Sequence, residues 1–165
     1  MRLLSSGAIR RSINYWRPFL FSGIRVTAIS HDWRQASAEL RLHWWNRNAV
    51  GTMFGGSLFA LTDPFYPLMI QHNLGPSYSV WMKSALVEFL SPGRTVAHAS
   101  FLLSAERLDQ IRAATEAGGK CEPVFSVAVS GPEGKAIARV TLTVYVRMRR
   151  KAPTEMGKVA EAVRQ

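Results

Sequence analysis

Hydrophobic and polar residues alternate with a period of two over much of this chain, which is the pattern of half-buried β-strands. In residues 23–30 the alternating apolar set is Ile24, Val26 and Ala28. Residues 35–44 follow the same rule, and their apolar face carries Ala36, Ala38, Leu40 and Leu42. Their polar face carries Gln35, Ser37, Glu39, Arg41 and His43. The pattern predicts two strands joined by a turn at 31–32.

The second half of the chain also consists mainly of predicted strands. They cover residues 78–90, 95–104, 123–130 and 135–148. The first ends at the turn Ser91-Pro92-Gly93, and the last two form a hairpin around 131–134. Residues 105–117, which end at Gly118-Gly119, are either a short helix or an irregular excursion.

Two segments break the period of two and predict helices. Residues 7–20 place Ile9, Ile13, Trp16 and Leu20 at helical spacing. Residues 53–72 are apolar nearly all round, begin a helix near Gly55-Gly56, and contain Pro64 and Pro67, which are expected to kink or shorten that helix. A helix that is apolar on all sides must be covered. We therefore expect an α+β fold, with one curved antiparallel sheet of about six strands wrapped around this central helix.

The length of 165 residues fits one domain, and we divide it into an N-terminal amphipathic helix (1–21), a main domain (22–148) and a basic, polar tail (149–165). The single cysteine, Cys121, excludes an internal disulfide and a cysteine-based metal cage. The apolar stretch 58–70 is too short and too interrupted to span a membrane as a helix. We expect a cytoplasmic protein. The arginines among residues 1–20 leave an organellar transit peptide as the alternative.

The charge is strongly basic, with 21 Lys and Arg against 11 Asp and Glu. The excess lies at the ends, because residues 51–100 carry only two charges of each sign. Such a surface attracts phosphates on nucleic acid, anionic lipid or a phosphorylated ligand. No nucleic-acid motif accompanies it, and the neutral middle argues against a continuous groove, so we expect no nucleic-acid partner.

The candidate chemistry lies in the segment 48–63. Gly55 and Gly56 stand where a loop enters the helix, so a ligand can approach the backbone, and the first N–H groups of the helix have no internal acceptor. Such N–H groups can bind a developing oxyanion. Asp63 follows in apolar sequence, where burial raises the pKa of a carboxyl and suits it to act as a base or nucleophile. The alternative is that Asp63 caps a second helix starting at Pro64.

The strands, the central helix and this segment together resemble the hotdog fold, and in particular the PaaI-like acyl-CoA thioesterases. Their pattern is Asn, two residues, Gly, two residues, His-Gly-Gly and an acid nine residues after the His. Asn48, Gly51, Gly55, Gly56 and Asp63 stand in register with it, and Phe89-Leu90-Ser91-Pro92-Gly93 resembles the strand end that follows. The sequence is most similar to the DUF4442 subgroup, in which Phe-Gly-Gly and Asp-Pro occur.

The resemblance implies a role for each matched residue. Asp63 would activate water or attack a thioester carbonyl, the Gly55 N–H would polarise that carbonyl beside Gly56, and Asn48 would orient the water or the acid. It also implies an acyl-CoA or related thioester as substrate, with coenzyme A only as part of it and no separate cofactor. The site would lie between the subunits of a homodimer, which pairs further into a tetramer in some relatives.

This sequence departs from the family pattern at two positions of the segment. Phe54 replaces the histidine, and Pro64 follows the acid directly. The partner-strand hydroxyl of some relatives would fall at Met82, and Ser84 is the nearest hydroxyl. The candidate substrate-binding residues are Phe54, Ser57, Lys83 and Ser84.

Several other residues carry open alternatives. Lys83 is predicted on one face with Ala85, Val87 and Phe89. It is either a binding residue, for a substrate carboxylate, a phosphate or Asp63, or a solvated lysine. The cluster Arg147, Arg149, Arg150 and Lys151 meets nucleotide phosphates or is a solvated strand end. We interpret Trp44, Trp45 and Trp81 as core or interface aromatics. The four histidines show no metal-ligand spacing, so we predict no metal site.

Three hypotheses from different classes follow. The first is an acyl-CoA thioesterase. The second is a non-catalytic acyl-CoA or fatty-acyl binding protein on the same fold, motivated by Phe54 and by Pro64. The third, a nucleic-acid binding module, rests on charge alone. A hotdog dehydratase ranks lower, because its chemistry uses a histidine and the segment 48–63 has none.

Overall fold

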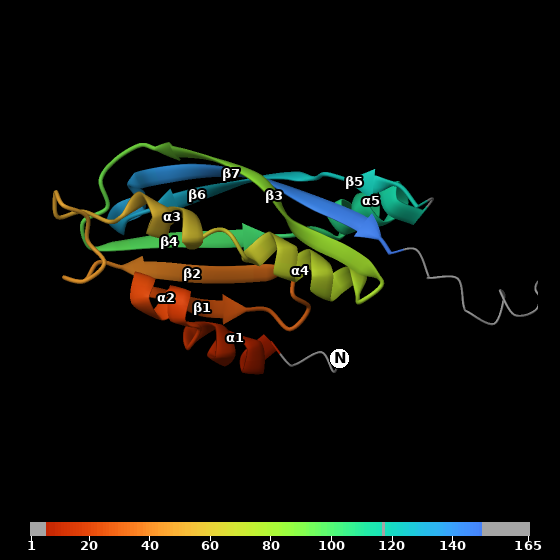
Figure 1. Cartoon of the computed structure of the whole chain (residues 1–165), viewed down its shortest axis with the longest axis horizontal. Coiled ribbons are helices and arrows are strands. Elements are labelled where there is room, and N and C mark those ends of the chain that lie inside the picture. The colour runs from red at the N-terminus through yellow and green to blue at the C-terminus, as the bar shows by residue number, and fades with distance from the viewer. Residues whose placement is uncertain (1–5, 117, 150–165) are drawn as a thin grey trace, which may run out of the picture.

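A curved antiparallel sheet of seven strands makes up most of the molecule (Figure 1). The computed structural model describes residues 6–116 and 118–149. The strands are β1 (Ile24–Ile29), β2 (Gln35–Arg41), β3 (Tyr78–Phe89), β4 (Val96–Leu102), β5 (Lys120–Cys121), β6 (Val124–Ser130) and β7 (Ala136–Met148). The helices are α1 (Ser6–Asn14), α2 (Arg17–Ser22), α3 (Gly55–Ala60), α4 (Phe65–Leu74) and α5 (Ala105–Glu116), with a 3₁₀ turn, η1, at Pro132–Gly134.

The spatial order of the main strands is β1-β2-β4-β6-β7-β3, and β5 pairs with β7 beside this path. All pairs are antiparallel, with Val26 opposite Ala38 and Val127 opposite Val140. The predicted hairpins are therefore confirmed. The path leaves β1 and β3 at the two edges of the sheet. The additional strand β5 is only two residues long and was not predicted.

The sheet curves around α3 and α4, as the hotdog fold requires, and the predicted fold class is confirmed (Figure 1). The helices contribute six of the buried apolar side chains: Leu58, Leu61, Phe65, Tyr66, Met69 and Ile70. Phe65 stacks on Phe101 of β4 at 4.2 Å, and Tyr66 stacks on Phe125 of β6 at 3.9 Å. These contacts hold the inner face of the sheet to the central helix.

The segment 53–72, predicted as one helix with a possible kink, is two helices. Hydrogen bonds continue α3 for about one turn, as far as the Asp63 N–H, which donates to the Phe59 carbonyl. The second helix, α4, then begins at Phe65. Pro64 lacks an N–H and cannot extend the first helix, so the break falls at the first of the two prolines that the sequence indicates. Pro67 lies in the first turn of α4 and does not interrupt that helix.

The N-terminal helix predicted over 7–20 is also interrupted. Its first part, α1, ends at Asn14, and α2 starts at Arg17 with Pro18 in its first turn, where no backbone donor is needed. Asn14 fixes α1 to the edge strand, because its side chain donates to the Val26 carbonyl and accepts from the Val26 N–H at 2.7 Å. Gly23 ends α2 in the left-handed conformation, with φ of 73°.

Three further details bear on the sequence predictions. Glu39, predicted on the exposed face of β2, is buried and accepts a hydrogen bond from Arg41 Nε at 2.9 Å. Residues 105–117 contain the regular helix α5 rather than an irregular excursion. Of the predicted tail, residues 150–165 lie outside the described residues, and with them Arg150 and Lys151 of the basic cluster. Within the described part, no helix is both long and apolar enough to cross a membrane.

Candidate active site

Asp63 lies at the junction between α3 and α4, on the wall of a hollow of about 330 Å³. The other residues of this hollow are apolar: Ile13, Trp16, Pro64, Pro67, Leu68 and Met82. They come from α1, the α1–α2 junction, α4 and β3. Among the described residues, Asp63 is therefore the only titratable group on the wall of this otherwise apolar hollow.

The carboxylate of Asp63 has no polar partner within residues 6–116 and 118–149. The capping alternative is wrong, because the start of α4 has no side-chain cap. Burial raises the pKa of Asp63 above its ordinary value of 3.8. The cause is desolvation, which disfavours the charged form when no hydrogen bond or cation offsets it. A half-buried carboxylate without partners is free to accept a proton from a bound reactant.

Gly55 and Gly56 form the first turn of α3, after Phe54 in an extended conformation. The Phe54 carbonyl accepts the N–H groups of Ser57 and Leu58, whereas those of Gly55 and Gly56 have no acceptor among the described residues. A methyl group on Gly55 would meet the Phe89 ring at 2.8 Å, and one on Gly56 would clash with the Phe54 ring. The two exposed phenylalanine rings therefore pack directly over the glycines, and a side chain at either glycine would require the ring to move.

Asn48 holds the loop that leads into α3. Its side-chain oxygen accepts the N–H groups of Val50 and Thr52, and its Nδ2 donates to the Thr52 hydroxyl at 2.9 Å. Asn48 and Gly55 line a second hollow, of about 410 Å³, together with residues 89–93 at the end of β3. The carboxamide therefore shapes the wall beside the free Gly55 N–H.

The predicted substrate-binding residues lie in different surroundings. Phe54 is exposed and covers Gly56, whereas Ser57 is buried on α3. Lys83 sits at a β-bulge of β3, and its ammonium group pairs with Glu122 rather than with Asp63. Ser84 follows the bulge, exposed on the same strand. Because of the bulge, the strict alternation assumed for residues 83–89 fails at Lys83.

The hollows that contain Asp63 and Gly55 are separate in one chain, and their lining residues do not overlap. The sequence pattern predicts these two residues in one site, and it does not predict Ile13 and Trp16 beside Asp63. Their helical spacing predicts a buried stripe, but it does not specify the element that the stripe covers. No three His, Cys, Asp or Glu side chains are grouped as metal ligands in the described ranges.

Comparison with known families gives a match over residues 6–146 to DUF4442, a domain of unknown function. The chain belongs to the DUF4442 family. The match includes α1 and α2, so in this DUF4442 protein the N-terminal helices are part of the family domain. No curated protein matches the sequence significantly.

Solved structures similar to this DUF4442 protein share the hotdog fold at low sequence identity. A Pseudomonas aeruginosa protein of unknown function, described as a probable thioesterase, has a TM-score of 0.77 and 19% identity over 88% of this chain and 97% of its own. A Haemophilus influenzae thioesterase has a TM-score of 0.66 and 15% identity, covering 93% and 97% of the two chains. The Escherichia coli PaaI protein has a TM-score of 0.57 and 12% identity, covering 87% and 91%.

Proposed function

We propose that this DUF4442 protein hydrolyses acyl thioesters, such as acyl-CoA, with Asp63 as the reacting carboxylate. The observation that carries the proposal is the carboxylate of Asp63, which lacks a polar partner and borders a hollow otherwise lined by apolar side chains. A hollow of this kind suits an apolar acyl group. The similarity of fold to a described thioesterase agrees with this chemistry.

In the proposed reaction, Asp63 takes a proton from water, and the resulting hydroxide adds to the thioester carbonyl carbon. The tetrahedral intermediate then expels the thiolate as the C–S bond breaks, and the thiolate is protonated by Asp63. The alternative course is direct attack by the carboxylate, which forms an anhydride that water hydrolyses. In both courses negative charge develops on the carbonyl oxygen, and the free Gly55 N–H is suited to stabilise it.

This chemistry requires the carboxylate and the N–H donor to lie within about 3 Å of the same reacting group. In one chain Asp63 and Gly55 line separate hollows. We therefore propose a homodimer in which Asp63 of one copy and Gly55 of the other complete a site between them. Asn48 then acts by holding the loop beside the N–H donor, and Phe54 and Ser84 lie on exposed surface available to the partner or the substrate.

The free edge of the sheet supports such a dimer. Edge strand β3 is 12 residues long and exposed along most of its length, including Leu86 and Phe89. A long, exposed and apolar edge strand tends to pair with another strand. Pairing of two β3 strands would bring the α3–α4 segments of two copies together beside the joined sheet.

The proposal is tested by thiol release from a panel of acyl-CoA thioesters of different chain length. We expect Asp63→Asn to lower kcat/KM by about 100-fold or more, because the amide cannot accept the proton. Asp109→Asn, which changes an exposed aspartate on α5, is the matched control and should leave turnover unchanged.

Equal turnover by wild type and Asp63→Asn would contradict the catalytic role of Asp63. Absence of turnover by the wild type on every chain length would overturn the thioesterase proposal. If acyl-CoA then bound without hydrolysis, the chain would be an acyl-CoA binding protein, in keeping with the replacement of histidine by Phe54.

A further inference from the structure

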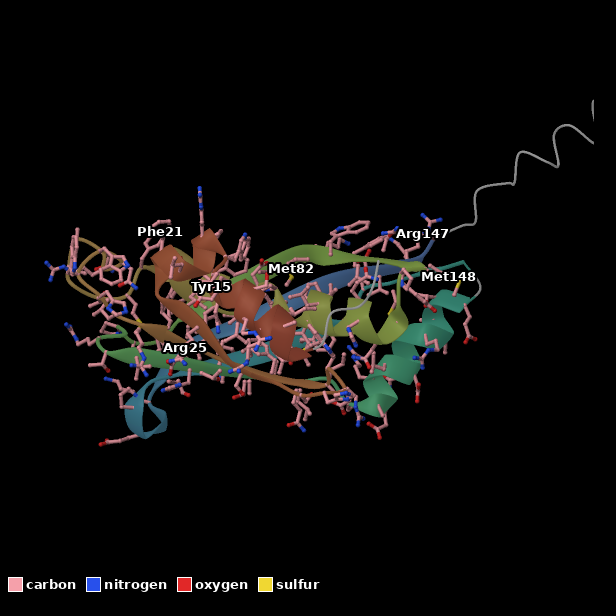
Figure 2. The ribbon with its side chains drawn as sticks, turned by 90° about the horizontal axis from the view of Figure 1, so that it is seen from below. Tyr15, Phe21, Arg25, Met82, Arg147 and Met148 are labelled. Carbon is pink, nitrogen blue, oxygen red and sulfur yellow. The ribbon has the colours of Figure 1, made fainter. Side chains whose placement is uncertain are left out.

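Besides Trp16, which borders the hollow of Asp63, five large apolar side chains are exposed on the N-terminal helices and on the loop that follows β2. They are Tyr15 (78% exposed), Leu20 (52%), Phe21 (67%), Trp44 (78%) and Trp45 (49%). Figure 2 shows Tyr15 and Phe21 in the half of the molecule opposite the one that holds Arg147 and Met148. The two tryptophans are thus not core residues of this chain, contrary to one of the two alternatives for them.

A shared hollow and a ring contact link four of these side chains, and the fifth, Phe21, is the neighbour of Leu20 on α2. Tyr15, Leu20 and Trp45 line the same hollow, which has a volume of about 550 Å³. Asn46 ties the tryptophan loop to α2, because its Nδ2 donates to the Ser22 carbonyl at 2.8 Å. We call this surface the aromatic–arginine face and define it by the five apolar residues and the arginines described next.

Arginines surround the apolar side chains of this face. Arg10, Arg11, Arg25 and Arg41 line the hollow itself. Arg17 lies on α2, and Arg47 follows Asn46. Arg41 is paired with Glu39. The other five arginines have no acidic partner within 4.0 Å in the described part of the chain.

We propose that the aromatic–arginine face docks this protein on the surface of an anionic lipid bilayer. Arginines interact with lipid phosphates, and tyrosine and tryptophan rings favour the boundary between headgroups and acyl chains. A helix with apolar and basic residues on its exposed side is typical of proteins that lie on a membrane. The phosphates of a soluble nucleotide would pair with the arginines, but the nucleotide would leave the side chains of Phe21 and Trp44 exposed to water.

The aromatic–arginine face also lies close to the candidate active site, because both adjoin α1. The consequence for catalysis rests on the proposed function. Ile13 and Trp16 line the hollow of Asp63, whereas Arg10, Arg11 and Tyr15 line the hollow of the face. Both hollows therefore border α1 and the residues directly after it. Docking would hold the acyl hollow close to lipids that carry or dissolve long acyl chains.

Co-sedimentation of the full-length protein with lipid vesicles tests the proposal without any measurement of hydrolysis. We expect binding to phosphatidylcholine vesicles that contain about 30% phosphatidylglycerol to be at least about tenfold tighter than to phosphatidylcholine alone. About 1 M salt should weaken the difference through screening. Tryptophan fluorescence should shift to the blue when the anionic vesicles are added.

Two double variants separate the contributions of charge and apolar surface. Arg11→Ala/Arg25→Ala should weaken binding to the anionic vesicles by about twentyfold, since each arginine near such a surface contributes about fivefold. Phe21→Ala/Trp44→Ala should weaken binding and abolish most of the fluorescence shift. The matched control, Leu102→Ala/Arg112→Ala, removes an exposed leucine and an exposed arginine elsewhere and should bind as the wild type does.

Three outcomes would overturn the proposal. The first is no binding, or equal binding to neutral and anionic vesicles. The second is weakening of the control pair by as much as the test pairs. The third is a different occupant. Free coenzyme A would be that occupant if it bound through Arg11 and Arg25 while no vesicles bound. A second copy of the chain would be that occupant if Phe21→Ala/Trp44→Ala lowered the mass of the oligomer. The Asp63→Asn variant leaves this face intact, so it should bind vesicles as the wild type does even if the hydrolysis proposal fails. Loss of vesicle binding by both proteins would mean that the docking proposal fails.

Discussion

At the scale of single residues, Asp63 and Gly55 have unused hydrogen-bonding capacity for different reasons. The Asp63 carboxylate is surrounded by apolar side chains that offer it no donor. The Gly55 N–H is free because the first turn of a helix has no acceptor for it. Phe54, which stands where the family pattern has histidine, contributes an exposed ring over Gly56.

The raised pKa of Asp63 predicts a specific effect of pH on stability. The pKa of Asp63 in the folded state lies above the unfolded value of 3.8, so the folded state binds the proton more tightly. The free energy of unfolding therefore decreases as the pH rises through the folded-state pKa. We expect Asp63→Asn to have a higher Tm than the wild type at pH 7, with no difference near pH 3. Calorimetry at several pH values measures this, and a lower Tm of the variant at pH 7 would contradict the assignment.

The same shift bears on activity. The carboxylate must be ionised to act as a base, so kcat/KM should fall on the acid side at a pH above the ordinary pKa of an aspartate. A profile of kcat/KM against pH on one acyl-CoA substrate measures this limb. An acid limb at or below the ordinary value would show that Asp63 is not desolvated in the functional protein.

At the scale of elements, the turn between β1 and β2 is fixed to the central helix by aromatic stacking. Trp33 is buried in this turn with a φ of 55°, in the left-handed region that is costly for a bulky side chain. Its ring stacks on His72 of α4 at 4.5 Å, and its carbonyl accepts a hydrogen bond from Asn73 Nδ2 at 3.2 Å. These contacts hold the turn against the end of α4.

The stacking predicts that acid weakens the contact between this turn and α4. Burial, and then the nearby His31, lower the pKa of His72 below 6.5. The unfolded chain therefore binds the proton more readily, and stability is lost as pH falls below 6.5. We expect His72→Phe, which keeps the stacking, to lose less Tm than the wild type between pH 7 and pH 5.

Thermal unfolding followed by circular dichroism at each pH measures the effect. His98→Gln, on β4, serves as the control for removal of an exposed histidine. An equal loss of Tm in His72→Phe and wild type would show that the titration of His72 has no part in the acid sensitivity.

At the scale of the whole molecule, much of the exposed apolar surface falls into two groups. One group follows β3 and the start of α3, and includes Trp81, Leu86 and Phe89. The other is the aromatic–arginine face around α1 and α2. We assign the first group to a second copy of the chain, because it follows the free edge of the sheet. We assign the second group to a lipid surface, because it combines apolar side chains with five arginines that have no acidic partner among the described residues.

The first assignment predicts that a charge on β3 prevents dimer formation. Leu86→Lys would bring like charges from two copies together along the paired edges, and we expect it to weaken the dimer by about tenfold or more. Leu102→Lys, at an equally exposed leucine on β4, is the control. Sedimentation equilibrium measures the mass. A monomeric wild type, or an unaffected dimer in Leu86→Lys, would contradict pairing through β3.

The six longer strands, the hairpins and the break at Pro64 follow from the sequence. Each depends on residues close together in the chain, namely a period of two, a turn, or a proline that lacks an N–H. The segment 48–63 also indicated Gly55, Gly56 and Asp63 as candidate site residues. This was possible because a pair of glycines where a loop enters a helix, and an acid in apolar sequence, can be recognised within a short stretch of the chain. The bulge at Lys83 and the break between α1 and α2 were not predicted, since weaker and more distant contacts determine them.

The surroundings of these residues were decided only by the tertiary structure. The sequence alone determined that a carboxylate and free N–H groups lie on one apolar helical segment. It did not determine that Ile13, Trp16 and Met82 enclose Asp63, or that Gly55 opens into a different hollow. The hydrophobic effect is non-directional, so a hydrophobic pattern specifies which face of an element is buried but not what covers it. That choice depends on the packing of elements far apart in the chain, and it determined both the desolvation of Asp63 and the separation of its hollow from that of Gly55.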